Sequence, residues 1–271
     1  MTPPGDDEPT ESPAASESSA TADAPVTGDA PPDDARFTDP RDPPRSSRAE
    51  AALIAAAVTI ATALTIGWAF HPDRAGAAAM LIAIGAVYAP GAVLTLLWLR
   101  RRGELRSTLL PMAGDLTAGA VIAALLYGAA MGANLLLTPP GSPRSAWILR
   151  LYLQLGDPEA MGRVMVAGVV FVIAALEEIV WRGLAMRALE GPLGSLRAWL
   201  LSSVLYAAAH LPTLFLLGDP VAGPNPLIVM AAMGCGLVWG WIVLRWGRLT
   251  PAVFAHAFFS WAVVSFPIWR P

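Results

Sequence analysis

The sequence predicts an all-α bundle of about seven membrane-spanning helices. Hydrophobic residues make up 55% of the 271 residues and charged residues only 14%, whereas a soluble protein has roughly 45–50% and 25%. Mean hydropathy is +0.53, and apolar runs long enough for a hydrocarbon core of about 30 Å recur along the chain. These runs lack the alternation of strands. This composition fits a soluble enzyme or a nucleic-acid binder poorly. A disulfide scaffold is excluded as well, because Cys235 is the one cysteine.

The first 48 residues differ in composition from the rest of the chain. They are rich in Pro, Ser, Ala and Asp, and Phe37 is their one aromatic residue. Eleven acidic residues stand against four Arg there, and no apolar stretch typical of a signal peptide is present. Such a segment has too little apolar surface to offset the entropy of ordering. We therefore expect residues 1–48 to form a disordered acidic tail on the cytoplasmic side.

Two membrane-embedded regions follow the tail. Residues 49–160 hold the N-terminal spans and a segment, 138–160, in which Arg144 and Arg150 stand among apolar residues, as in a helix that lies in the membrane interface. Residues 161–268 hold the helices that carry the chemistry described below. The expected spans lie near residues 50–70, 76–99, 113–137, 162–181, 198–217, 226–244 and 250–268.

Arginine in the short loops indicates the orientation of the protein. If seven spans are counted, four Arg clusters fall on one side, and the opposite loops around 71–75 and 218–225 hold a single Arg between them. The clusters are Arg41, Arg45 and Arg48; Arg100, Arg101, Arg102 and Arg106; Arg182, Arg187 and Arg197; and Arg245 and Arg248. Positive charge marks the cytoplasmic side. We expect a multi-pass protein of the plasma membrane with its N-terminus inside and its C-terminus outside.

Ionisable side chains gather in the last four spans, where each costs roughly 2.5–3.5 kcal/mol to insert and is therefore a functional candidate. They and their polar neighbours are Glu177, Glu178 and Arg182, then Tyr206 and His210, then His256 and Ser260. Glu178 and Arg182 are four residues apart and share a helix face, which predicts an ion pair. Glu177 is turned about 100° away from Glu178, toward another neighbour. Helices in lipid bury such polar ridges against one another.

This residue set supports two chemistries. Glu177 beside His210 can hold and deprotonate a water, while His256 and Ser260 can donate hydrogen bonds to the oxyanion of a peptide bond under attack. Equally, Glu177, His210 and His256 can bind Zn²⁺ and acidify its water. The His-Glu-x-x-His motif is absent, so a metal would need ligands from separate helices. No cofactor is certain from the sequence, and Zn²⁺ stays an open alternative.

Three smaller features have structural interpretations. Gly236 and Gly240, with Gly234 nearby, form a small-xxx-small pattern that indicates close helix packing. Cys235 is expected to be a small packed side chain. Asp115 is interpreted as a helix-end cap near Gly114 and is left out of the site.

Three motifs in order resemble the CPBP family of CAAX prenyl endopeptidases and Abi-type membrane proteins. They are Glu177-Glu178-x-x-x-Arg182, Tyr206-x-x-x-His210 and His256-x-x-x-Ser260, within about residues 160–265. The resemblance implies an intramembrane endopeptidase, labelled a metalloprotease, in which Glu177 and His210 activate water. His256 and Ser260 would form the oxyanion site, and Glu178 and Arg182 would be a structural pair. Tyr206 replaces the family's usual Phe, and Ser260 replaces its usual Asn.

The partners that follow are membrane lipid and a protein or peptide substrate, which is prenylated in the better-known relatives; nucleic acid is not expected. Two other classes remain open. A non-catalytic scaffold or bacteriocin-immunity-type protein of the same fold is favoured by Ser260, whose hydroxyl is a shorter donor than a carboxamide. A proton-coupled transporter would also place Glu and His in its spans, although matched Pro-interrupted half-helices are absent.

Overall fold

The computed structural model describes residues 46–156 and 162–268, and within those ranges it contains helices and no β-strand. Six of its helices are long and apolar enough to cross a membrane, and Thr250–Ser265 is a shorter apolar helix. The predicted all-α bundle with about seven spans is therefore confirmed. The predicted tail lies outside the described residues, except for Ser46, Ser47 and Arg48.

The elements follow one another along the chain with short connections. They are α1 (Arg48–Ala69), η1 (Pro72–Arg74), α2 (Ala78–Arg101), α3 (Leu105–Leu109), α4 (Asp115–Leu137), α5 (Ser145–Gln154), α6 (Arg163–Val180), η2 (Trp181–Met186), α7 (Arg187–Leu193), α8 (Ser195–Ala209), α9 (Pro212–Leu216), α10 (Leu227–Trp246) and α11 (Thr250–Ser265).

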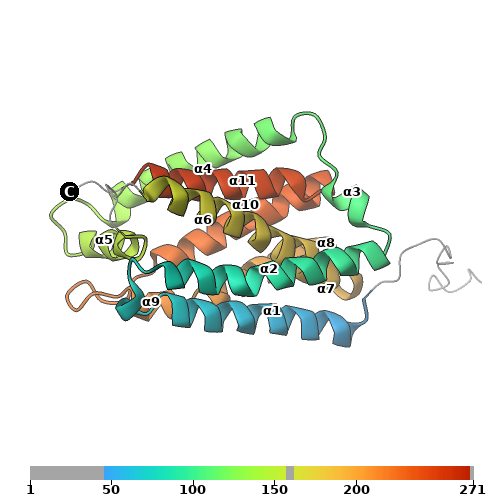
Figure 1. Ribbon diagram of the computed structural model, residues 1–271, viewed down its shortest axis with the longest axis horizontal. Helices are drawn as coiled ribbons and strands as arrows, with labels where there is room; N and C mark the ends of the chain where they lie inside the picture. The colour runs from blue at the N-terminus through green and yellow to red at the C-terminus, as the bar shows by residue number, and fades with distance from the viewer. Residues whose placement is uncertain (1–45, 157–161, 269–271) are drawn as a thin grey trace, which may run out of the picture. The chain divides into compact units, whose positions relative to one another are not determined.

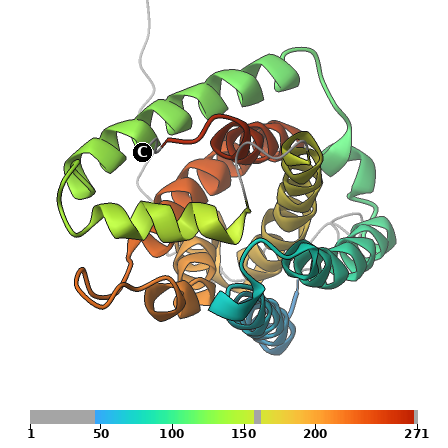
Figure 2. The same ribbon diagram turned by 60° about the vertical axis from the view of Figure 1, so that its left-hand side comes forward.

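The long helices lie side by side, and α11 is central to their packing (Figure 1). It packs against α4 on one side and α6 on the other, while α10 packs against α8 and α2 against α6. Figure 2, turned by 60°, shows α6, α10 and α11 grouped together, with α4 on the outer side of α11. The first and third motifs therefore lie on helices in direct contact, α6 and α11, while α8, which carries the second motif, contacts η2 and α10.

One predicted span ends elsewhere in the structure, and another matches its predicted range but is interrupted. The fourth span does not stop near residue 181, because α6 continues through the π-helical turn η2 into α7 and the whole helix runs to Leu193. Arg182 therefore lies inside this helix, where it is buried, and not in a basic loop. The fifth span is interrupted: α8 ends at Ala209, and Pro212 opens the short helix α9. Proline has no N–H to continue the ladder of α8.

Small residues bring α8 and α10 together, as the Gly pattern predicts. A Cβ added at Gly240 would lie 2.5 Å from Cδ1 of Trp199, and one at Gly236 would lie 3.3 Å from Cδ1 of Tyr206. Cys235 is buried and free. The space that a β-carbon would fill is occupied by aromatic rings of the neighbouring helix, so these glycines set the distance between the two helices.

Asp115 does not cap α4 as expected: it is the first residue of the helix, and the N-cap Gly114 makes no side-chain cap hydrogen bond. Its carboxylate accepts from the backbone N–H of Met112, before the helix, at 2.9 Å and forms an ion pair with Arg248 at 2.9 Å. Part of the segment 138–160 forms the helix α5, which lies at the end of the long helices opposite α3 and α7 (Figure 1). Its place in a membrane interface stays a prediction.

The contact between α4 and α11 yields a stability prediction. A Cβ at Gly119 would clash with Cβ of Phe254 and lie 3.0 Å from the backbone nitrogen of Ala255. These atoms are not flexible side-chain ends, so Gly119→Ala should lower the free energy of unfolding by about 1–3 kcal/mol, as overpacking does. Thermal unfolding in detergent measures the effect. Gly128→Ala on the same helix meets nothing within 4 Å and is the matched control; equal melting temperatures would contradict the packing.

Candidate active site

The candidate site is built on the last turn of α6 and the π-helical turn that follows it. Glu177 and Glu178 end the apolar run of α6, and Trp181 and Arg182 open η2. Glu178 and Arg182 are almost completely buried, with 0% and 1% of their surface exposed. A π-helical turn inside an α-helix is frequent at functional sites. The fold thus places two charged side chains where water cannot solvate them, so each needs a protein partner.

Glu178 is held by two cationic or potentially cationic groups. Arg182 donates from Nη1 to Oε1 of Glu178 at 2.9 Å, which confirms the predicted ion pair. Nδ1 of His256, on α11, lies 2.9 Å from the same oxygen. Because a carboxylate only accepts, this contact places a proton on Nδ1. Arg182 also donates to the carbonyl of Gly236 at 3.2 Å, so the pair ties α6 to both α10 and α11.

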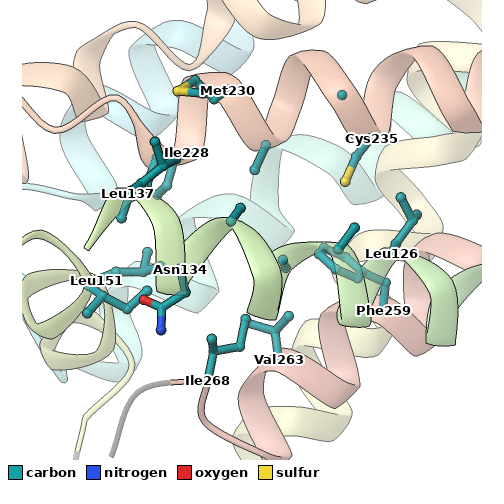
Figure 3. A pocket seen from close by; sticks show the side chains of 17 residues that line it. Leu126, Asn134, Leu137, Leu151, Ile228, Met230, Cys235, Phe259, Val263 and Ile268 are labelled. Atoms are coloured by element: carbon teal, nitrogen blue, oxygen red, sulfur yellow. The ribbon is translucent and has the colours of Figure 1, made fainter. Parts of the chain in front are cut away.

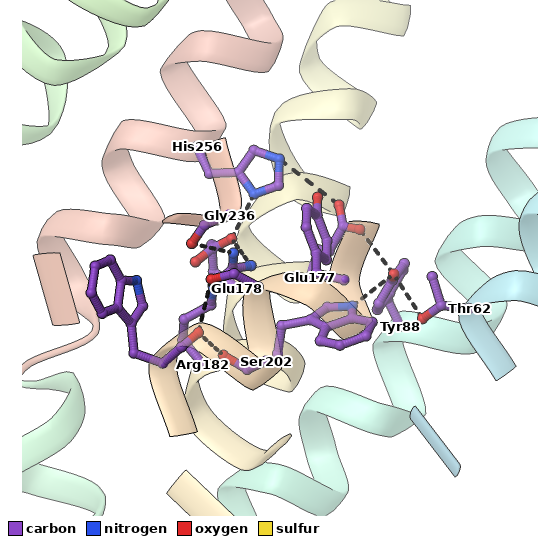
Figure 4. A network of polar contacts seen from close by, with 12 residues as sticks. Thr62, Tyr88, Glu177, Glu178, Arg182, Ser202, Gly236 and His256 are labelled. Carbon is purple, nitrogen blue, oxygen red and sulfur yellow. Dashed lines mark hydrogen bonds and ion pairs between the residues drawn. The ribbon is translucent and has the colours of Figure 1, made fainter. Parts of the chain in front are cut away.

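Glu177 faces a different set of partners, as its rotation from Glu178 predicts. The hydroxyl of Tyr88, on α2, donates to Oε1 of Glu177 at 2.9 Å. The other oxygen, Oε2, lies 3.8 Å from Nε2 of His256. Figure 4 shows the imidazole of His256 with one ring nitrogen turned toward each glutamate. Two of the predicted site residues, Glu177 and His256, therefore face each other across a gap slightly longer than a hydrogen bond.

Aromatic rings fix the orientation of His256. Trp239 of α10 stacks on the imidazole with ring centroids 3.7 Å apart and an angle of 20° between the planes. Tyr206 lies at the edge of Trp239, 6.3 Å away, and its ring is 4.6 Å below the guanidinium carbon of Arg182. The imidazole is thus held by stacking on its face and by a hydrogen bond at Nδ1. Nε2 is the ring nitrogen that remains available to bind a ligand or substrate.

His210 occupies the break between α8 and α9 and not the interior of a helix. Its Nδ1 lies 2.7 Å from the carbonyl oxygen of Tyr206, and its ring meets the ring of Tyr206 at a centroid distance of 4.7 Å. A carbonyl only accepts, so Nδ1 carries the proton and neutral His210 presents Nε2 as a base. His210 interacts electrostatically with Glu177, His256 and Arg182. His210 therefore belongs to the same cluster of ionisable side chains, although within the described residues it makes no direct hydrogen bond to Glu177, His256 or Arg182.

Ser260 lies one turn beyond His256 on α11 and is half-buried. Within the described ranges, its hydroxyl is not joined to the network of Glu177, Glu178 and His256. Sequence reasoning also missed four contributors to that network: Thr62, Tyr88, Trp181 and Trp239. For Tyr88 and Trp181 the available signal was chemical, because a Tyr hydroxyl or Trp N–H inside an apolar span needs a partner; Trp239 joins by stacking on His256.

The donor set gives a direct test of the metal alternative. No group of three His, Cys, Asp or Glu side chains that could hold a metal ion is found among the described residues. Nδ1 of each imidazole is engaged by a protein oxygen, so Nε2 is the nitrogen that each could offer to a metal ion. As arranged here, Glu177, His210 and His256 are not found as such a group, and the side chains alone supply the steps of the proposed reaction.

Together these features define a multi-pass membrane protein with a Glu–His site enclosed in its helix bundle. Residues 159–262 match the family described as type II CAAX prenyl endopeptidase Rce1-like, which confirms the resemblance to the CPBP family over this part of the chain. The matched segment contains all three polar motifs. It supports a membrane endopeptidase of the CAAX type, and α1, α2 and α4 lie outside it. Neither the curated proteins nor the solved structures contain a match to the chain.

The shared oxygen of Glu178 yields a second prediction. Arg182→Met should lower the free energy of unfolding by about 3–5 kcal/mol, because it leaves a buried carboxylate without its main partner. Melting temperatures in detergent measure the loss, and adding Glu178→Gln to the variant should restore part of it. The control is Arg150→Met, because Arg150 pairs with Asp219 on a partly exposed surface and should change little. If both single variants melt alike, the buried pair does not support the fold.

Proposed function

We propose that the protein is an intramembrane endopeptidase in which Glu177, assisted by His210, activates a water for attack on a peptide bond near the membrane. The observation that supports this most strongly is the opposition of the Glu177 carboxylate and the His256 imidazole, 3.8 Å apart and enclosed by α6, α10 and α11. A carboxylate that can take a proton from water therefore faces an imidazole that can donate to the oxyanion, as the proposed hydrolysis needs.

The proposed reaction has two steps. Oε2 of Glu177 takes a proton from the water, while Nε2 of His210 accepts a hydrogen bond that orients it. The water oxygen bonds to the carbonyl carbon, and the carbonyl electron pair moves onto oxygen to form a tetrahedral oxyanion. Glu177 then gives its proton to the amide nitrogen, the C–N bond breaks, and the carbonyl re-forms. The products are a carboxylic acid and an amine.

The oxyanion is assigned to His256 and Ser260. When His256 carries both ring protons, its Nε2–H can donate to the developing negative charge, and the Ser260 hydroxyl is the second candidate donor. Glu178 and Arg182 support this role, since the carboxylate accepts from Nδ1 of His256 and so aims Nε2 into the site. A carboxylate that orients an imidazole in this way is familiar from hydrolytic triads.

The proposed substrate is a protein or peptide that carries a lipid group, in a membrane whose lipid surrounds the spans. A cavity of about 380 Å³ lies between α4, α10 and α11, and its lining is apolar except for Asn134 (Figure 3). Phe259, in its wall, lies 6.2 Å edge-on from Trp239, which stacks on His256. A hydrocarbon chain is the ligand that such a lining accommodates, and the rings of Phe259 and Trp239 connect its wall to His256.

The proposed orientation places the N-terminus in the cytoplasm and the C-terminus outside. The ends of the long helices near α3 and α7 carry most of the Arg, whereas α5 and α9 lie at the opposite end (Figure 1). The residues at the Arg-rich end are Arg48, Arg100, Arg101, Arg102, Arg106, Arg187, Arg197, Arg245 and Arg248. Positive charge favours the cytoplasmic side. Protection of an N-terminal tag in intact cells tests this, and tag cleavage from outside would reverse the assignment.

Replacement of the proposed base yields the third prediction. Glu177→Gln and His210→Ala should each lower kcat by about 10²–10⁴-fold, the usual contribution of general acid–base catalysis. Cleavage of a lipidated CAAX-type peptide by purified protein in detergent measures this. Glu190→Gln, on α7, replaces a carboxylate outside the site and is the matched control. A wild-type kcat in Glu177→Gln would contradict the proposed mechanism.

The two other classes give different outcomes in the same assays. A non-catalytic scaffold is favoured by the separation of Ser260 from the hydrogen-bonded network, and it would show no cleavage until Ser260→Asn supplies a longer donor. A transporter would show pH-gradient-driven uptake in proteoliposomes and no cleavage. Substrate trapping with Glu177→Gln, followed by mass spectrometry, would identify the partner of an active protease.

The metal alternative yields the fourth prediction. Because the described side chains do not gather into a three-ligand site, turnover should persist after dialysis against a strong chelator. The measurement is kcat before and after dialysis, with elemental analysis of the purified protein. A loss of activity that Zn²⁺ restores would instead support the metal alternative.

A further inference from the structure

Tyr88 lies on α2, outside the matched segment 159–262, yet its hydroxyl is joined to the candidate base. It is 2.9 Å from Oε1 of Glu177, 3.1 Å from Oγ1 of Thr62 on α1, and 3.3 Å from Nε1 of Trp181 on η2. The side chain is buried, with 3% of its surface exposed. Three helices therefore converge on one hydroxyl group deep in the bundle, as Figure 4 shows.

The direction of each hydrogen bond follows from what the groups can donate. The indole N–H of Trp181 only donates, so the Tyr88 oxygen accepts from it. An ionised Glu177 only accepts, so the single proton of Tyr88 goes to Oε1. The remaining lone pair of Tyr88 can then only accept from the hydroxyl of Thr62. The chain Thr62→Tyr88→Glu177 thus has one polarity, and every hydrogen-bonding position of the Tyr88 hydroxyl is filled.

Thr62 differs from the other threonines of α1 in a way that supports this polarity. Thr59 and Thr65 donate to the backbone carbonyls of Ala55 and Ala61, each at 2.7 Å. This is the usual behaviour of Thr in a membrane helix. The hydroxyl of Thr62 instead pairs with Tyr88 and is fully buried. Its side chain is therefore committed to Tyr88 and not to its own helix.

We propose that Tyr88 is a positioning residue, which anchors Oε1 of Glu177 so that Oε2 is the oxygen that faces His256 and takes the proton of the water. Thr62 and Trp181 hold the hydroxyl in that orientation. The inference rests on the proposed function and extends it to α1 and α2. Without the anchor, the carboxylate can rotate about its terminal torsion, which is broad for Glu, and the reactive oxygen is no longer fixed relative to the peptide bond.

Tyr88→Phe removes the hydroxyl while keeping the ring, and it tests positioning through a split of kinetic constants. We expect kcat to fall roughly 10- to 100-fold, the range for a hydrogen bond to a charged group, with KM unchanged. Thr62→Val should lower kcat by a few fold, whereas Thr62→Ser, which keeps the hydroxyl, should keep the wild-type kcat. Thr59→Val is the matched control on α1 and should behave as wild type. A purely structural role would lower the yield of folded protein without separating kcat from KM.

The outcomes separate this inference from the proposed function. If Glu177→Gln is inactive while folded Tyr88→Phe keeps the wild-type kcat, the positioning role is overturned and the protease stands. If Tyr88→Phe does not fold, the Thr62→Val and Thr62→Ser pair decides, and equal kcat values in both would overturn the proposal. Infrared spectroscopy gives a readout that does not depend on substrate. The carboxylate band of Glu177 is identified as the band that disappears in Glu177→Gln. Tyr88→Phe should shift this band, and an unshifted band would contradict the anchor.

Discussion

The structure depends on one carboxylate oxygen, Oε1 of Glu178, which contacts both Arg182 and His256 at 2.9 Å. A buried charge is tolerated only when it is paired and hydrogen-bonded. Here the pairing joins α6, η2 and α11, so the requirement to neutralise a charge in an apolar bundle also fixes the register of the helices that carry the motifs. The same contact aims Nε2 of His256 toward Glu177. The groups that satisfy the electrostatics of the bundle therefore also set the geometry of the proposed reaction.

Aromatic and small residues complete that geometry. Trp239 stacks on His256, and Tyr206 packs between Trp181, Trp239 and His210. Gly236 and Gly240 allow α8 to approach α10 closely enough for these rings to meet. Bulky rings leave few alternative side-chain positions at native packing density. The site is thus held by packing on the faces of its rings and by hydrogen bonds at their edges.

The two halves of the described chain contribute unequally to the proposed chemistry. The last helices supply the acid, the imidazoles and the guanidinium, and they coincide with the matched segment. The first helices supply Tyr88, whose hydroxyl contacts Glu177, and Thr62, whose hydroxyl contacts Tyr88. A reacting group held from two directions has less freedom than one held from its own helix alone, and this preorganisation is what electrostatic catalysis requires.

The amino-acid sequence by itself determined the helical class, the approximate spans, the Glu178–Arg182 pair and the positions of the three polar motifs. These follow from local quantities: apolar length against membrane thickness, and spacing on a helix of 3.6 residues per turn. The tertiary structure alone decided that His256 bonds Glu178, that Glu177 bonds Tyr88, that Trp239 covers His256, and that Ser260 stays apart. Such contacts depend on how helices distant in sequence rotate and cross. Ridge-and-groove packing over their whole length sets those angles, and the spacing within one motif does not contain them.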